Sequence, residues 1–139
     1  MKFAVAVDGS DQSDNAVSYA MNIAECLGAS VTLLHSSVPE IYSEGGDMLI
    51  EDMSEAETRG ETVLADARET AESQNSEIEI SAELLYGDPA DEIVRYAEDE
   101  EFDAIYVGHR GMSQKQEDLM GSVAQEIVRR ASMPVTVVR

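Results

Sequence analysis

The sequence is poor in several features that mark common classes of protein. Its 139 residues include one cysteine, Cys26, so the chain cannot form an intrachain disulfide or a cysteine metal cluster. It has no apolar run near the ~20 residues of a membrane span, and no early apolar run with a basic flank. The sequence therefore predicts a cytoplasmic protein without a membrane segment. Cys26 falls in an apolar helical pattern and is predicted to be a small core residue.

Basic residues are also scarce. Nine lysines and arginines stand against 29 aspartates and glutamates, which gives a formal net charge of -20. Without a basic patch the chain is not expected to bind DNA or RNA, because such binding depends on displacing counterions from the phosphate backbone. The acids are spread along the chain. This is typical of a halophilic surface that tolerates molar salt, or of an ordinary acidic cytosolic protein.

Several enzyme motifs are missing as well. The sequence has no G-x-x-x-x-G-K-[ST] phosphate loop, no G-x-G-x-x-G after a strand and no G-x-S-x-G nucleophile elbow. Its two histidines lie far apart, so the ligand spacing of metal hydrolases is absent too. Asp8, Ser10 and His35 could be imagined as a triad, but nothing in the sequence shows that they share hydrogen-bonding geometry. No catalytic residue is predicted.

What the chain does have is a regular alternation of apolar strands and amphipathic helices. Helices are predicted from Ser13 to Leu27, over about 48–74, from Pro89 onward and after Ser122. A loop is predicted over 39–46. Strands are predicted at 2–8, 30–36, 77–86, 104–108 and 134–139. This order predicts a single α/β domain over residues 1–139. Its sheet should be open, doubly wound, five-stranded and mostly parallel, with helices on both faces.

Three polar segments follow predicted strands. They are Asp8–Ser10, His35–Val38 and the stretch VGHRGMSQKQEDLMGS at 107–122. The carboxyl ends of parallel strands meet at one edge of a sheet, and ligands bind there where the winding reverses. The sequence therefore predicts a candidate site at this edge.

The glycines of the last segment suit an anion. Gly108 and Gly111 would let a ligand approach the main chain closely, and Gly121-Ser122 precedes a helix whose free N–H groups and dipole attract negative charge. An ordinary chain reversal that only caps the helix would show the same pattern. His109 and Arg110, inside the loop, could face phosphate or only solvent.

The other two segments are also open to two interpretations. Asp8 could accept hydrogen bonds from ribose hydroxyls or an exocyclic amine, or it could cap the first helix, as Ser10 or Asp11 also could. His35 ends an apolar run, where a histidine is either a packed side chain or a ligand contact.

These residues resemble a known family. Gly108-x2-Gly111-x9-Gly121-Ser122 is similar to the G-x2-G-x9-G-[ST] nucleotide motif of the universal stress protein family. The resemblance extends through VAVDGSDQSDNAVSYA, LLHS, YGDPADEIVRYAEDEEFDAIYVGHRG and GSVAQEIVRRASMPVTVV. It implies a doubly wound fold with strand order 3-2-1-4-5 and a homodimer formed through the C-terminal strand 134–139. It also implies ATP binding, since members that keep the glycine motif bind ATP.

The resemblance further implies a role for each matching residue. Asp8 would meet the ribose and adenine side, and the main chain of Ser36 would recognise the adenine edge. The contacts implied with ribose and phosphates come from the backbone of Gly108, Gly111, Gly121, Ser122 and Val123, helped by the Ser122 hydroxyl. His109 and Arg110, which lie between these glycines, complete the set of candidate site residues.

The chain departs from the family in the nine-residue spacer of the motif. MSQKQEDLM has Lys115 as its only base, beside Glu117 and Asp118, and this negative charge should weaken the binding of a triphosphate. AMP or ADP is therefore an alternative to ATP, with or without Mg²⁺.

The resulting hypothesis is a regulatory, ATP-binding stress-response protein with little or no hydrolysis. The sequence offers no evident general base or arginine finger to speed phosphoryl transfer. One alternative is a dimeric interaction module of the same family that does not bind nucleotide, its site spoiled by the acidic spacer. Another is an adenylate-using enzyme on a related fold.

Overall fold

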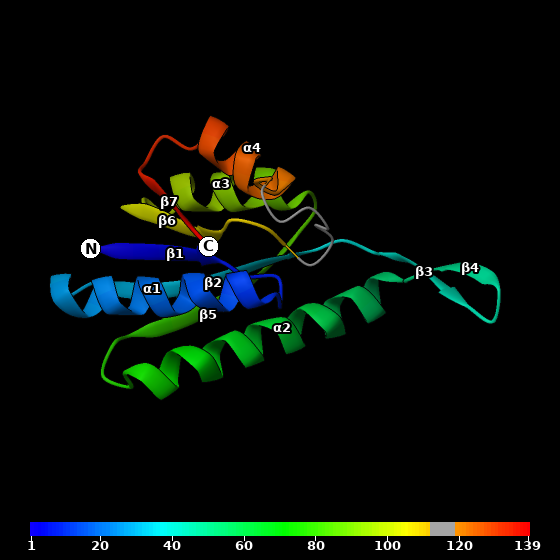
Figure 1. The fold of residues 1–139 in the computed structure, drawn as a ribbon, viewed down its shortest axis with the longest axis horizontal. Helices are drawn as coiled ribbons and strands as arrows, with labels where there is room; N and C mark the ends of the chain where they lie inside the picture. Colours follow the sequence, from blue (N-terminus) through cyan, green and yellow to red (C-terminus); the bar gives the residue numbers. More distant parts are fainter. Residues whose placement is uncertain (112–118) are drawn as a thin grey trace.

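The computed structural model describes residues 1–111 and 119–139, and in this part of the chain five parallel strands form the central sheet (Figure 1). The strands are β1 (Lys2–Ala6), β2 (Ser30–Ser37), β5 (Ile80–Tyr86), β6 (Ala104–Gly108) and β7 (Val135–Val138). They lie in the order β5-β2-β1-β6-β7. Counted along the chain without the small hairpin β3–β4, this is 3-2-1-4-5, so the predicted fold class and strand order are confirmed.

Helices cover both faces of this sheet. Those of the described residues are α1 (Asp11–Leu27), α2 (Met53–Gln74), α3 (Pro89–Asp99) and α4 (Ser122–Arg130). Figure 1 shows α1 and α2 on one face and α3 and α4 on the other. Successive residues of β1 enter different cores: Val5 packs with the α1 and α2 side, and Ala4 and Ala6 with the α3 and α4 side. Because both faces are buried, the strand needs no polar alternation.

The stretch between β2 and α2 differs from the prediction. Instead of a loop over 39–46 and a helix from about 48, the chain forms an antiparallel hairpin of β3 (Ile41–Glu44) and β4 (Asp47–Ile50), hereafter the arm. Gly45 and Gly46, at φ 59° and 87°, make the two-residue turn that such a hairpin needs. Helix α2 begins only at Met53, because the Asp52 side chain caps it by accepting from the Glu55 N–H at 2.8 Å.

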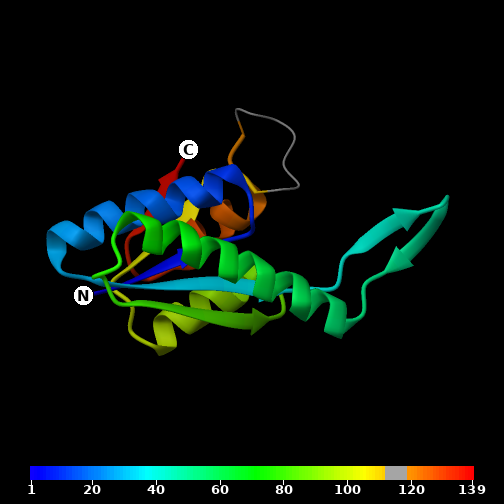
Figure 2. The same cartoon turned by 90° about the horizontal axis from the view of Figure 1, so that it is seen from below.

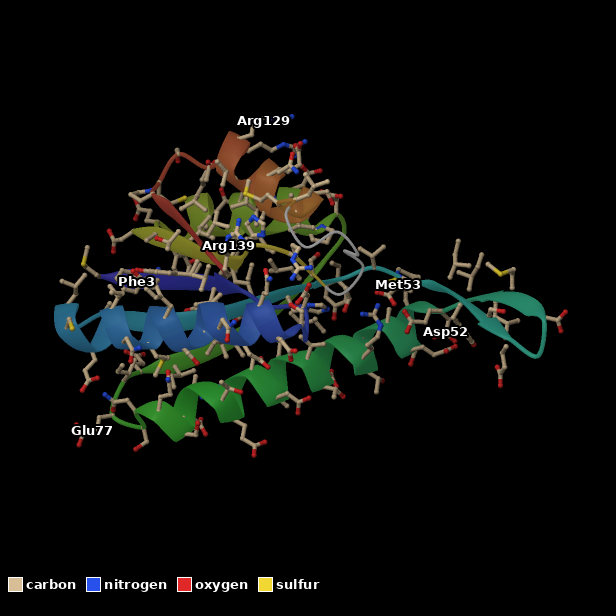
Figure 3. The ribbon with its side chains drawn as sticks, in the orientation of Figure 1. Phe3, Asp52, Met53, Glu77, Arg129 and Arg139 are labelled. Atoms are coloured by element: carbon tan, nitrogen blue, oxygen red, sulfur yellow. The ribbon has the colours of Figure 1, made fainter. Side chains whose placement is uncertain are left out.

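The arm extends away from the rest of the molecule (Figures 1 and 2). Every residue of its two strands is exposed, including Ile41, Met48 and Ile50. Figure 3 shows Asp52 and Met53 at the end of α2 that adjoins the arm. The arm therefore adds nothing to either core.

Cys26 was predicted to be a core residue, and this prediction is wrong. The buried face of α1 includes Ala16, Ala20 and Ala24, and a residue two positions after Ala24 lies about 200° around the helix. Cys26 is accordingly exposed.

We expect the Cys26 thiol to react in the folded protein as fast as in the unfolded chain, because no packing restricts access to it. Titration with a chromogenic disulfide reagent, with and without denaturant, measures this. A thiol that reacts only after unfolding would contradict its placement.

None of the helices in residues 1–111 and 119–139 combines the length and the apolar character that crossing a membrane requires.

Candidate functional site

A cavity of about 460 Å³ opens at the carboxyl ends of β1 and β6. The chain leaves β1 toward β2 on one side of the sheet, and β6 lies on the other side, so the winding reverses here. Eight of the nine predicted site residues line the cavity: Asp8, Ser36, Gly108, Arg110, Gly111, Gly121, Ser122 and Val123. His109 does not line it. The topology thus brings the three predicted segments to one place.

Asp8 follows β1 and is held at the wall of the cavity. Its Oδ1 accepts from the Ser10 N–H at 2.9 Å, while its own N–H donates to Ser13 Oγ at 3.2 Å. The cap of α1 is Ser10, whose Oγ accepts from the Ser13 N–H at 3.1 Å. Asp8 is therefore not the helix cap, and its carboxylate lies between the start of α1 and Gly111.

Ser36 and His35 lie near the end of β2, and both line the cavity although their side chains leave opposite faces of the strand. Ser36 Oγ donates to the Gly87 carbonyl at 2.7 Å, so its hydroxyl is already engaged and its main chain is the part left to meet a ligand. His35 Nδ1 lies 2.7 Å from the Val7 carbonyl, which makes Nδ1 the protonated nitrogen of the ring. Its buried Nε2 has no hydrogen-bond partner among the residues the structure describes.

The surroundings of His35 favour its neutral form. Burial lowers its pKa from the ordinary 6.5, the nearby Arg59 charge lowers it further, and the bond to Val7 opposes them in part. The unfolded chain therefore binds a proton below about pH 6.5 that the folded chain does not. The contribution of neutral His35 to the free energy of unfolding is complete above this pH and is lost as the pH falls.

We expect the free energy of unfolding to fall below about pH 6.5, by at most about 1.4 kcal/mol per pH unit, and the His35→Gln variant to lose this dependence. Urea denaturation at neutral and mildly acidic pH measures it, because the carboxylates titrate at lower pH. An equal slope in the wild type and the variant would show that His35 is not the group responsible.

The glycines of the motif lie where side chains do not fit. A Cβ on Gly108 would be 2.9 Å from the Gln12 carbonyl carbon and 3.0 Å from the Ser13 nitrogen, and a Cβ on Gly111 would overlap Asp8 Oδ2. Glycine at these positions lets β6 and its loop pack directly on the start of α1. It also leaves main-chain atoms at the wall of the cavity.

Helix α4 begins at the cavity without a side-chain cap. The caps of α1, α2 and α3 are Ser10, Asp52 and Asp88, whereas the cap position of α4 is Gly121, which has no side chain to accept a hydrogen bond. The first turn of α4 contains no acid, and its last turn contains Arg129 and Arg130. Uncapped N–H groups and the positive end of the dipole therefore face the cavity, as in anion sites.

His109 and Arg110 hold the loop after β6 in place. The His109 N–H donates to the Val138 carbonyl at 2.6 Å, and its carbonyl accepts from the Gly121 N–H at 2.7 Å. The Gly121 N–H is thereby used, so Ser122 and Val123 have the first N–H groups left for a ligand. The Arg110 N–H donates to Gln12 Oε1 at 2.7 Å. Its side chain lines the cavity, with Nε unpartnered within residues 1–111 and 119–139.

Several residues of the cavity wall lie outside the three predicted segments. They include Glu40, Arg59, Val63, Pro89 and Ile93, whereas Val38 and Val107 fall within those segments. The position of Pro89 could have been inferred, because it stands next to the predicted helix start at Asp88. Arg59 gave no signal, because only the packing of α2 on the sheet brings it to this wall.

The predicted acidic spacer falls largely outside the described residues. Lys115, Glu117 and Asp118 belong to 112–118, so their effect on a triphosphate stays a prediction. Within the described ranges no group of three or more His, Cys, Asp or Glu residues is placed to hold a metal ion. Asp8 and Glu40 are the carboxylates that line the cavity in this part of the chain.

The fold and the cavity define an open, parallel α/β protein with a cavity at its switch point and an uncapped helix start in the cavity wall. The profile of the universal stress protein family matches residues 1–139, and the chain belongs to this family. A universal stress protein of Methanocaldococcus jannaschii is 34% identical over 142 residues, covering 99% of this chain and 81% of the relative.

Solved structures agree with this assignment. The universal stress protein from Archaeoglobus fulgidus in complex with dAMP is 26% identical, with a TM-score of 0.77 over 100% of this chain and 98% of that one. A universal stress protein in complex with cAMP is 25% identical, with a TM-score of 0.76 over 100% of this chain and 96% of that one.

Proposed function

We propose that this chain binds an adenine nucleotide in the cavity and acts as a regulatory stress-response protein of its family. The observation that carries the proposal is the uncapped start of α4, which lines the same cavity as Asp8 and Ser36. Relatives of similar fold are known in complex with dAMP and cAMP, which supports an adenine nucleotide as the ligand.

The site suggests an orientation for the nucleotide. The adenine edge would meet the main chain at Ser36, and the ribose would lie beside Asp8. The phosphates would lie between Gly111 and Ser122, where main-chain N–H groups and the α4 dipole stabilise negative charge. Mg²⁺, when present, would be held by phosphate oxygens and water, as is usual for this ion.

The proposed role is to hold the nucleotide rather than to hydrolyse it. Rapid phosphoryl transfer requires a group that orients the attacking water and a cation that stabilises the transition state. Asp8 Oδ1 accepts from the Ser10 N–H, and His35, which lines the cavity, is held by the bond of its Nδ1 to the Val7 carbonyl. The described wall supplies donors for binding, which fits a nucleotide-dependent switch.

Calorimetry with ATP, ADP and AMP, at low and at molar salt, tests the proposal. We expect binding of at least one of the three, with molar salt favouring ATP over AMP if the acids of the spacer repel the triphosphate. If no nucleotide gives heat or a thermal shift at either salt, the dimeric module without nucleotide becomes the better account.

A homodimer through residues 134–139 is the second part of the proposal. β7 is an edge strand of the sheet, and all four of its residues are partly exposed. An apolar edge with unpaired main-chain groups favours pairing with its copy. Light scattering at working salt tests this, and a monomer would refute it.

The high net charge leads to a prediction about salt. Arg59, Arg68, Arg95, Arg129 and Arg130 are each paired with a carboxylate, yet a formal charge of -20 leaves most acids unmatched. If the surface is halophilic, molar KCl should raise the thermal midpoint by screening this repulsion. A midpoint indifferent to KCl would favour an ordinary acidic protein.

A further inference from the structure

Arg59 of α2 lies between the candidate site and the arm. Its guanidinium donates to three acceptors: Nη2 to the Val38 carbonyl at 2.9 Å and to Glu51 Oε1 at 3.0 Å, and Nε to Glu51 Oε2 at 3.1 Å. Nη1 lies 3.4 Å from Glu40 Oε1. Such a bidentate contact has a fixed geometry, which a lysine cannot reproduce.

The two carboxylates that contact Arg59 flank the arm on either side. Glu40 precedes β3 and Glu51 follows β4, and their main chains are joined by the Glu51 N–H donating to the Glu40 carbonyl at 2.9 Å. The Glu40 N–H in turn donates to Glu51 Oε1 at 3.1 Å. The Glu51 side chain is 13% exposed, and the hydrogen bond from Arg59 lowers its pKa. One carboxylate thus ties both ends of the arm to α2.

Beyond this base the arm has little to hold it in place. Both of its strands are exposed throughout, and a two-stranded hairpin is marginally stable in water without a packed face. The position and order of the arm therefore depend on the contacts at Glu40 and Glu51.

The same contacts form part of the cavity wall. Val38, Glu40 and Arg59 line the cavity, together with Ser36 two residues before Val38. A ligand beside them would lower the local dielectric around the Arg59 guanidinium. Charge-assisted hydrogen bonds strengthen as the local dielectric falls. The hydrogen bonds between Arg59 and Glu51 should therefore strengthen when the cavity is filled.

We propose that Arg59 is a positioning residue that links occupation of the cavity to the order of the arm. The inference rests on the proposed nucleotide site for its ligand. Because linkage is reciprocal, a contact that orders the arm would also tighten nucleotide binding. The order of the exposed arm then depends on whether the cavity is occupied.

Hydrogen exchange of the amides of residues 41–50, with and without saturating AMP, tests this link. In the wild type we expect AMP to slow exchange in the arm by about fivefold or more, the lower range of allosteric coupling. In Arg59→Gln, AMP should bind more weakly because the linkage is reciprocal, and even at saturating AMP the exchange in the arm should no longer respond to the nucleotide. Arg59→Lys should restore only part of the response.

Arg68→Gln is the matched control. Arg68 lies on the same helix, pairs with Glu72 and donates to the Ile80 carbonyl at 2.9 Å, away from the arm and the cavity. This variant should keep the full response of the wild type.

The outcomes separate the two proposals. AMP that binds the wild type without slowing exchange in the arm would overturn the link and leave the nucleotide site intact. A full response in Arg59→Gln would show that the link runs through other residues. If AMP, ADP and ATP all fail to bind the wild type, the proposed site falls, and the link falls with it.

Discussion

Replacing Gly121 with valine is expected to weaken nucleotide binding by about 100-fold or more, which corresponds to about 2.7 kcal/mol. A Cβ at this position would lie 3.3 Å from Arg110 Cα and 3.4 Å from the His109 carbonyl oxygen. The two further methyl groups of valine have to be accommodated at the start of α4, where the phosphates are proposed to lie. Calorimetry with the nucleotide that binds the wild type most tightly measures the effect.

The fold should survive this change. Gly121 has φ -63° and ψ 154°, a conformation open to any residue, so the backbone is not strained by a side chain. Gly121→Ala adds only the Cβ and should give an intermediate loss of affinity. Ser122→Ala keeps the main-chain donors and lacks only one hydroxyl, so it should lose less nucleotide affinity than Gly121→Ala. A valine variant that binds nucleotide as the wild type does would place the phosphates elsewhere.

Replacing Gly60 with alanine is expected to destabilise the fold by about 2 kcal/mol. A Cβ on Gly60 would lie 2.7 Å from Leu84 Cδ1 and 3.1 Å from His35 Cδ2, and it would overlap Ser37 Oγ. Ser37 is buried and donates to the Ala56 carbonyl at 3.0 Å, so it cannot move without losing that bond. The better helix propensity of alanine offsets only about 1 kcal/mol of this cost. Urea denaturation gives the difference.

Thr62→Ala is the control for this effect. Thr62 is exposed on the same helix, and its hydroxyl donates to the Thr58 carbonyl of that helix at 3.1 Å. We expect it to change stability by less than about 0.5 kcal/mol. A Gly60→Ala variant as stable as the wild type would mean that α2 can move off the sheet at little cost.

The sheet could be predicted from the sequence because its signals are local. Apolar runs without alternation mark strands buried on both faces, and Gly28, Asp88 and Pro89 mark helix ends where the structure has them. The meeting of Asp8, Ser36 and Gly108 then follows from the topology alone, since all three stand at carboxyl ends of parallel strands.

The arm and its anchor could not be predicted in the same way. Residues 41–50 are too few and too mixed to distinguish a hairpin from a loop, and the apolar pattern that begins at Met48 also fits a helix start. Gly45-Gly46 was the available signal, since paired glycines favour a two-residue hairpin turn. Arg59 reaches Val38 and Glu51 only because α2 packs at one particular register on β2.

The role of Gly60 also could not be predicted from local sequence signals. From the sequence it appears only as a weak point in a helix, since glycine lowers helix propensity. In the structure α2 continues through Gly60, and the missing side chain lets the helix approach Ser37 and Leu84. A residue that is unfavourable locally is required by its tertiary contacts.

A crystal structure of the chain grown with ATP is the most direct test of the nucleotide assignment. The account predicts adenine density beside the Ser36 main chain, ribose beside Asp8 and phosphate density at the N–H groups of Ser122 and Val123. Nucleotide bound at another surface, or a cavity filled only by water while calorimetry detects binding, would contradict it.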